Sequence, residues 1–282
     1  FHDGHPFTSA DVAYSILTLK KVHPRGRNTF ANVTEVATPD PLTAVIVLSQ
    51  PAPYLIKAFA GCESGIVPKH IYEGTDPVSN PNGNAPIGTG PYKFKEWVRG
   101  SHVVYVKNPD YWDPDLPRID QMVCKFIRDA GARSIAFENG SVDIGYRTPV
   151  ALSDLDRLKK LPHLEFETVG TSYSSNVQTL QFNLDSEFFK DIRVRRAVSQ
   201  AIDEEAIKAK VMRGFATPTA LMVGNGINGF DPALNQRLLP YDPIVARKLL
   251  AEAGYPDGFQ VGMDCPNDRY INDEGICQAV VA

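Results

Sequence analysis

Residues 121–145 read QMVCKFIRDAGARSIAFENGSVDIG and contain one complete strand–helix–strand unit. Alternating apolar residues predict a strand over 121–127. Asp129 can cap a helix that runs to about Glu138, and Asn139-Gly140 ends it before a short strand at 142–145. Similar patterns predict helices over 150–161, 191–201, 203–212 and 242–253, and strands over 164–169, 177–183 and 259–265. Strands that alternate with helices are typical of an α/β sheet, so we expect an α/β fold.

The residues before 121 predict a helix and two pairs of strands. The helix is expected over 7–22, where Asp11 lies three residues after Thr8 in the pattern of a capping box. The strand pairs are expected where alternating runs flank a turn, at 33–37 with 43–48 and at 92–98 with 102–107.

The composition disfavours two classes of partner. The chain has 29 lysines and arginines against 33 aspartates and glutamates, a net charge of −4. General nucleic-acid binding and a polybasic membrane anchor both need a surplus of positive charge. No apolar run approaches the roughly 18–20 residues that cross a bilayer. Because the chain starts without Met and residues 274–282 form an apolar helix pattern with no stop signal, we expect a sequence truncated at both ends.

The motifs of catalysis and cofactor binding are weak in this sequence. Gly224, Gly226 and Gly229 have the spacing of a dinucleotide fingerprint, but no helix pattern follows directly, so a glycine-rich surface loop is expected. His2 and His5 with the intervening Asp3 suggest a metal site, but a tight turn is the better interpretation. No GxSxG elbow or HExxH motif is present. We expect no catalytic residue, no metal and no cofactor.

Four cysteines leave two interpretations open. Cys265 and Cys277 are the closest pair and could form one disulfide in an oxidising compartment. Four reduced, buried thiols are the alternative, with Cys124 the clearest buried one.

Three arginines open the predicted helix 191–201, where the helix dipole disfavours cations. Ion pairs with Glu187, Asp191 or another lobe are therefore expected for the group Arg193, Arg195 and Arg196, and anion binding is the alternative.

Three groups of motifs occur in a fixed order along the chain. The first is FHDGHPFTSADV at 1–12. The second joins PIGTGPY at 86–92 to KNPDYW at 107–112 and NGSVDI at 139–144. The third joins FN at 182–183 to FFKDIRVRRA at 188–197. In this order and spacing the chain resembles the solute-binding proteins of peptide and nickel ABC transporters, the extracytoplasmic family 5 group.

The resemblance implies a fold of two α/β lobes joined by a hinge, like a type II periplasmic binding protein with an extra subdomain in its first lobe. Residues 1–183 would form part of the first lobe, including that subdomain, and residues 184–282 would begin the second. It implies a receptor that binds a small peptide or related polar solute in the periplasm and delivers it to an ABC permease. Such a protein is not an enzyme.

Two other functional classes stay open. A hydrolase on the same α/β scaffold would need a nucleophile and a base within hydrogen-bond reach. A chaperone or sensor that docks on a partner protein would need a large exposed apolar patch.

Ligand contacts are expected in loops at strand ends that face the cleft. The first place is Tyr146-Arg147, after the predicted strand 142–145, where the guanidinium could bind a carboxylate bidentately. The second is Ser172-Tyr173, before the predicted strand 177–183, which offers hydroxyls and a ring. A surface ion pair and a polar surface loop are the structural alternatives.

The third expected place lies between the predicted strand 259–265 and the last helix. It comprises Asn267, Asp268, Arg269 and Tyr270. Both charges, an amide and a ring within four residues suit a zwitterionic ligand. A helix-entry turn capped by Asn267 or Asp268 is the alternative.

Overall fold

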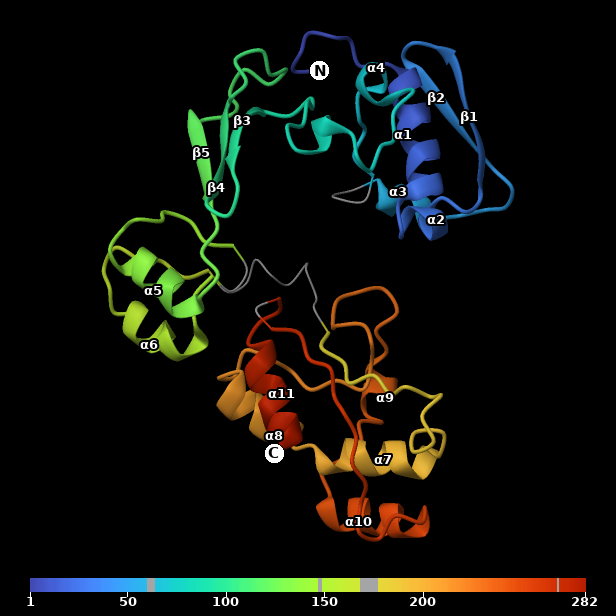
Figure 1. Ribbon diagram of the computed structural model, residues 1–282, viewed down its shortest axis with the longest axis vertical. Coiled ribbons are helices and arrows are strands. Elements are labelled where there is room, and N and C mark those ends of the chain that lie inside the picture. The colour runs from blue at the N-terminus through green and yellow to red at the C-terminus, as the bar shows by residue number, and fades with distance from the viewer. Residues whose placement is uncertain (60–63, 147–148, 168–176, 268) are drawn as a thin grey trace. The chain divides into compact units, whose positions relative to one another are not determined.

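The computed structural model describes residues 1–59, 64–146, 149–167, 177–267 and 269–282. The chain divides into two compact units, Phe1–Phe126 and Ile127–Ala282, shown in Figure 1. The division into lobes at residue 183 stays a prediction. Among the described residues, no helix has the length and apolar character to cross a membrane.

The first unit is built around helix α1 (Ser9–Val22) and an antiparallel hairpin, β1 (Val33–Asp40) with β2 (Thr43–Leu48). Ile16 of α1 and Phe30 are fully buried beside Val33, and these side chains centre the core. Short helices complete this part of the unit: α2 (Gly26–Thr29), α3 (Leu55–Ala58), α4 (Lys69–Tyr72) and the 3₁₀ turn η1 (Pro81–Gly83).

A separate sheet follows in the same unit. Strands β3 (Tyr92–Val98), β4 (His102–Lys107) and β5 (Gln121–Lys125) are antiparallel neighbours in that order. The predicted helix, both hairpins and the strand at 121 are thus confirmed, within a few residues at their ends.

The second unit is mainly helical in its described part. Its first core packs Val150, Leu155 and Leu158 under helix α5 (Ala130–Glu138). The Asp129 carboxylate accepts a hydrogen bond from the Ala132 amide at 2.6 Å, which confirms the predicted cap. The remaining elements are the 3₁₀ turn η2 (Leu152–Asp154), α6 (Leu155–Leu158), α7 (Ile192–Ala201), α8 (Glu204–Ala206), the π-helical turn η3 (Ile207–Val211), α9 (Pro232–Asn235), α10 (Pro243–Glu252) and α11 (Asp273–Val281).

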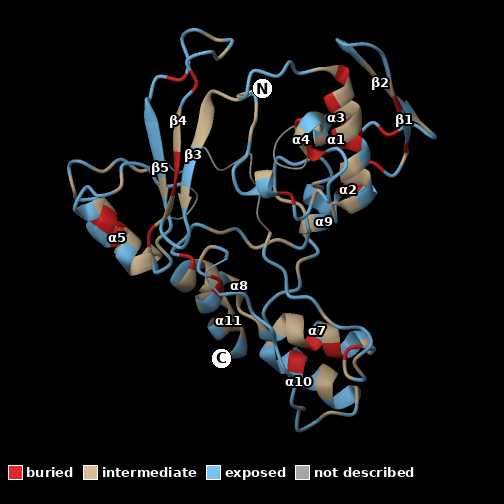
Figure 2. Ribbon diagram, turned by 45° about the horizontal axis from the view of Figure 1, so that its top comes forward, coloured by how far each residue is buried: buried red, intermediate tan, exposed pale blue. Residues whose placement is uncertain are grey.

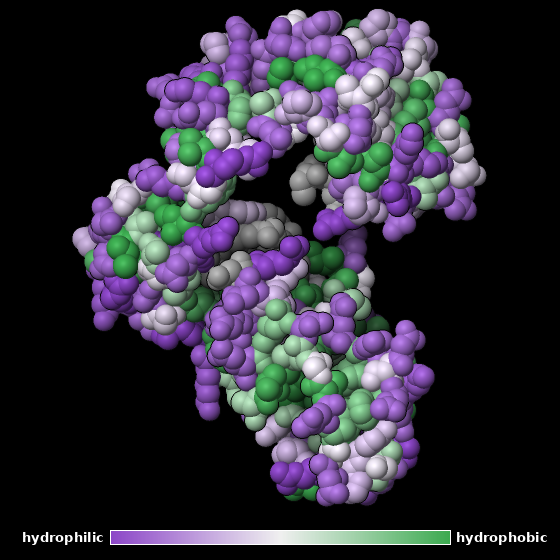
Figure 3. All heavy atoms as spheres, in the orientation of Figure 1, coloured by the Kyte–Doolittle hydropathy of each residue, from purple (hydrophilic) through white to green (hydrophobic). Residues whose placement is uncertain are grey.

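Helices α7 and α10 pack on each other, and both carry buried residues, among them Val194 in α7 and Ala246 in α10 (Figure 2). Arg193 secures the pair, because its guanidinium binds the Asp191 carboxylate and donates to the Glu252 carbonyl at 2.6 Å. The hydrogen bond from Arg193 lowers the pKa of Asp191. The ion pair expected for this arginine is confirmed. On the face seen in Figure 3, hydrophobic side chains are interspersed among hydrophilic ones.

Several predicted strands are wrong. Residues 142–145 form no strand, because the Ser141 and Val142 amides donate to the Ala136 carbonyl and finish the end of α5. The described residues in 164–169, 177–183 and 259–265 also lack strand ladders. A strand requires a neighbour, and these segments pair with none among the described residues.

Two helical predictions also need correction. The helix expected over 150–161 is replaced by η2 and the single turn α6. The glycine-rich stretch that ends at Gly229 has no helix pattern directly after it, but the one-turn helix α9 begins at Pro232.

Candidate functional site

The residues predicted from sequence have different outcomes. Tyr146 is exposed, with 67% of its surface accessible. Asn267 is exposed as well. Arg269 and Tyr270 lie together, because the Arg269 Nε donates to the Tyr270 hydroxyl at 3.0 Å. The others, Arg147, Ser172, Tyr173 and Asp268, lie outside the described residues.

Arg269 and Tyr270 belong to a loop closed by a disulfide between Cys265 and Cys277, whose Cα atoms are 6.4 Å apart. The alternative of four reduced thiols is therefore wrong. Cys124 is free and only partly buried, and Cys62 lies outside the described residues. We refer to residues 265–277 as the disulfide loop.

A buried carboxylate shapes the disulfide loop from inside. Asp273 is 5% exposed, and its Oδ2 accepts hydrogen bonds from the amides of Arg269 at 3.1 Å and Tyr270 at 2.9 Å. The helix that follows is entered through Asn272, which has a φ of 50°. The alternative of a helix capped by Asn267 is wrong, because α11 begins after Asn272; Asp268 lies outside the described residues.

Two side-chain bonds attach the disulfide loop to other segments. Gln178 Nε2 donates to the Ile271 carbonyl at 3.2 Å, so the chain that follows the predicted Ser172-Tyr173 site meets this loop. Asn272 Nδ2 donates to the Val211 carbonyl at 2.9 Å, at the last residue of η3. The disulfide loop is therefore anchored two residues before Arg213.

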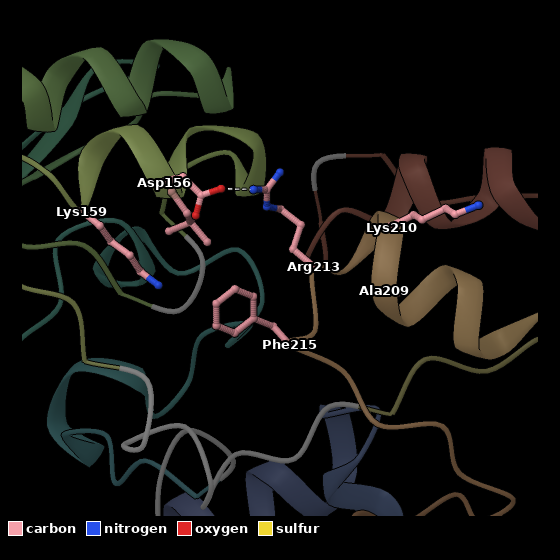
Figure 4. A pocket seen from close by; sticks show the side chains of 7 residues that line it. Asp156, Lys159, Ala209, Lys210, Arg213 and Phe215 are labelled. Atoms are coloured by element: carbon pink, nitrogen blue, oxygen red, sulfur yellow. Dashed lines mark hydrogen bonds and ion pairs between the residues drawn. The ribbon is translucent and has the colours of Figure 1, made fainter.

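A cavity of about 460 Å³ lies between α6 and the end of η3 (Figure 4). Its walls combine apolar and charged side chains: Leu155, Asp156, Lys159, Ala209, Lys210, Arg213 and Phe215. The Arg213 guanidinium forms an ion pair with Asp156. The Lys159 ammonium lies 5.5 Å from the centre of the Phe215 ring. In Figure 4 the Lys210 ammonium points away from the Asp156–Arg213 pair.

The charge of this wall favours anions. The residues that line the cavity include three cationic side chains and one carboxylate, a formal surplus of two positive charges, although the Lys210 ammonium points away from the Asp156–Arg213 pair. The guanidinium is the group best suited to a carboxylate, because its planar donors match both oxygens. The chemistry available here is recognition of an anionic group beside an apolar ring.

Sequence reasoning missed the cavity. The local sequence feature that points to this cavity is Arg213-Gly214, where a cation is followed by a helix-ending glycine directly after the predicted helix 203–212. Asp156, the ion-pair partner of Arg213, lies 57 residues earlier in the chain, and a single sequence does not reveal which distant residues form a pair.

The N-terminal histidines have structural partners. His2 Nε2 lies 2.9 Å from the Gly90 carbonyl oxygen, and His2 Nδ1 accepts the Gly88 amide at 3.3 Å. Asp3 pairs with His70 at 2.7 Å, and the His5 ring stacks on His70 with centroids 3.8 Å apart. No grouping of three or more metal-ligating side chains occurs in the described ranges.

A serine and a histidine lie within hydrogen-bond distance of each other in the first unit. Ser101 Oγ lies 2.8 Å from His102 Nδ1, and His102 Nε2 lies 3.9 Å from Glu96 Oε1. Ser101 is exposed at the turn between β3 and β4, and none of the three lines the cavity.

Comparison with known proteins identifies the family. The model of bacterial extracellular solute-binding proteins, family 5 Middle, matches residues 1–281. The glutathione-binding protein GsiB of Salmonella paratyphi A is 30% identical over 263 residues, which cover 92% of this chain and 49% of GsiB. The chain thus spans about half the length of the curated relatives it matches.

Solved structures agree in fold. The PBP AgaA from A. tumefaciens R10, in complex with agropinic acid, has a TM-score of 0.79 and 30% identity, with coverage of 99% of this chain and 55% of AgaA. The oligopeptide-binding protein AppA from Bacillus subtilis, in complex with a nonapeptide, has a TM-score of 0.72 and 26% identity, with coverage of 89% and 50%. The α/β fold is therefore that of periplasmic binding proteins, and the chain belongs to the bacterial extracellular solute-binding proteins of family 5.

Proposed function

We propose that this chain is part of the extracytoplasmic receptor of an ABC importer. The receptor binds a small peptide or related polar solute and delivers it to a permease in the membrane, without a catalytic step or a cofactor. The observation that carries the proposal is the family match over residues 1–281. The ligands named for three relatives are glutathione, agropinic acid and a nonapeptide, and each bears a carboxylate.

The cavity between α6 and η3 supports the proposal. Its surplus of cationic side chains suits a carboxylate-bearing solute, and its volume of about 460 Å³ is within the range of small-molecule sites. If the lobes divide at residue 183, α6 belongs to the first lobe and η3 to the second. Solute binding would then bias a hinge between open and closed states.

The disulfide supports a periplasmic location for this protein. Bridges such as Cys265–Cys277 form and persist in oxidising compartments outside the cytoplasm. This setting fits a receptor that collects solute before the membrane.

A thermal-shift screen tests the proposed function. The 282-residue chain and the complete product of its gene are compared with di-, tri- and oligopeptides, glutathione, opine-like amino-acid conjugates, nickel chelates and sugars. A solute at 100 times its dissociation constant adds about 2.7 kcal/mol of stability. We expect stabilisation of the complete product by peptides or conjugates and none by sugars. Failure of every solute to stabilise the complete product would contradict the proposal.

A further inference from the structure

Arg213 is held in an unusual backbone conformation at the edge of the cavity. Its φ of 50° lies in the left-handed region, which non-glycine residues rarely occupy. The surrounding backbone fixes this geometry, because the Met212 amide donates to Ile207 at 2.9 Å and the Gly214 amide donates to Lys208 at 2.8 Å. Strained residues of this kind cluster at ligand-binding sites. Arg213 is also reached after a π-helical turn, another feature enriched at functional sites.

Another carboxylate can displace Asp156, the ion-pair partner of Arg213, at small energetic cost. The Asp156 side chain is 71% exposed and that of Arg213 is 38% exposed. Ion pairs between exposed groups contribute little to stability, typically under about 1 kcal/mol. The fold therefore does not depend on this contact, and a second carboxylate can take the place of Asp156 at small cost.

Lys159 and Phe215, which also line the cavity, would contact the ligand's carboxylate and the group attached to it. Lys159 supplies a second cation on the same side as Asp156, one helical turn along from it. Phe215 is 49% exposed and presents its ring beside Lys159. A ligand with a carboxylate and an apolar or aromatic neighbour matches both features.

We propose that Arg213 binds the carboxylate of the transported solute and that Asp156 is an internal counter-ion, which the solute displaces. The site selects solutes that carry a carboxylate next to an apolar or ring-bearing group, which lies on Phe215. This inference rests on the proposed function, because it assigns the solute to this cavity.

The test compares matched solutes on matched variants of the complete gene product. The solutes are peptides that stabilise the wild-type protein, each with a free C-terminal carboxylate or a C-terminal amide. Arg213→Gln should weaken carboxylate binding about 10- to 100-fold and leave amide binding unchanged. Asp156→Asn should strengthen carboxylate binding about 2- to 5-fold, because the competing anion is gone. Isothermal titration calorimetry measures both.

Neighbouring residues give the controls. Arg157 pairs with Glu138 and with Asp154, and neither Arg157 nor Asp154 lines the cavity. Arg157→Gln and Asp154→Asn make the same charge changes within the same segment and should leave both affinities unchanged. Arg213→Lys keeps the charge but loses the planar donors, so its carboxylate affinity should fall between those of wild type and Arg213→Gln.

The possible results separate the two proposals. Equal affinities in wild type, Arg213→Gln and Asp156→Asn would overturn the role of this cavity and leave the receptor function standing. If no solute of the thermal-shift screen binds at all, the receptor function fails, and hippurate, a carboxylate beside an aromatic ring, becomes the probe. A saturable shift of the Arg213 Nε–H resonance by hippurate, at lower concentration in Asp156→Asn, would still support the cavity. No shift would overturn it.

Discussion

Asp11 shows how much structure one carboxylate can organise. It is 5% exposed, and it accepts hydrogen bonds from the Thr8 amide at 2.8 Å, the Thr8 hydroxyl at 3.0 Å and the Lys69 amide at 2.8 Å. Burial alone would raise the pKa of Asp11, but these bonds outweigh it and lower the pKa below its ordinary value of 3.8. One side chain thus starts α1 and ties it to α4.

Replacement of Asp11 should cost stability in a pH-dependent way. Asp11→Asn removes the charge from three hydrogen bonds, and we expect a loss of about 2 kcal/mol in the free energy of unfolding at pH 7. Because the folded pKa is lowered, the carboxylate stabilises the fold above its ordinary pKa and loses this effect as the pH falls through the lowered value. Urea titrations from pH 7 downward should therefore show wild type and variant converging in acid.

The exposed Asp115 in the same unit is the matched control for this substitution. Asp115→Asn should change the free energy of unfolding by less than about 0.5 kcal/mol at every pH. A constant difference between wild type and Asp11→Asn across the whole titration would contradict the role of the Asp11 charge.

At the scale of elements, the starts of several helices could be predicted from the sequence, whereas several of the predicted strands are wrong. The starts of α5 and α10 follow from Asp129 and Asp242, whose side chains accept hydrogen bonds from the first amides of their own helices. These signals are local, so one sequence contains them. The apolar run at 177–183 has the composition of a strand but no neighbour among the described residues. Pairing partners are distant in sequence, and composition alone does not supply them.

The disulfide loop is the element with the clearest energetic prediction. The Cys265–Cys277 bridge closes a loop with a sequence separation of 12, for which the chain-entropy relation gives about 3 kcal/mol. We expect dithiothreitol to lower the melting temperature of the chain by several degrees. Cys265→Ser should show the lower melting temperature already without reductant.

Cys124→Ser controls for other effects of the reductant, since Cys124 is a free thiol in β5. This variant should keep the full response to dithiothreitol. An unchanged melting temperature in reduced wild-type protein would show that the loop is held by its hydrogen bonds alone.

For the whole molecule, the division at residue 126 predicts an independently folding half. Unit Phe1–Phe126 contains its own core around Ile16 and Phe30 and a complete three-stranded sheet. A fragment 1–126 should unfold cooperatively in urea. With Trp112→Phe to remove the exposed indole, Trp97 of β3 reports on the sheet.

A fragment 1–100 is the control, because it lacks β4 and β5 but keeps Trp97. Its Trp97 emission should already be red-shifted before urea is added. Non-cooperative unfolding of 1–126, or the same emission from both fragments, would show that the first unit depends on the second.

At this same scale the residues expected to bind ligand stay a prediction, because neither Arg269 nor Tyr270 lines the cavity. The chemistry of Arg269 and Tyr270 predicts ligand binding. In the structure their side chains form a hydrogen bond within the disulfide loop, which is anchored to Val211 at the end of η3. The sequence analysis missed Arg213 because its place in the cavity wall depends on the ion pair with Asp156. No sequence pattern near either residue predicts that ion pair. The residue types within one loop can be identified from the local sequence. A cavity wall built from two segments that are distant in sequence can be identified only once the fold is known.

The π-helical turn at Ile207–Val211 also sets the register of everything that follows it. An α-helix advances by about 100° per residue, so the loss of one residue here would restore the normal pitch and rotate Arg213 away from Asp156. If Arg213 binds the solute as we propose, one codon gained or lost in this turn would change the side chain that faces the solute, with no substitution in the wall itself.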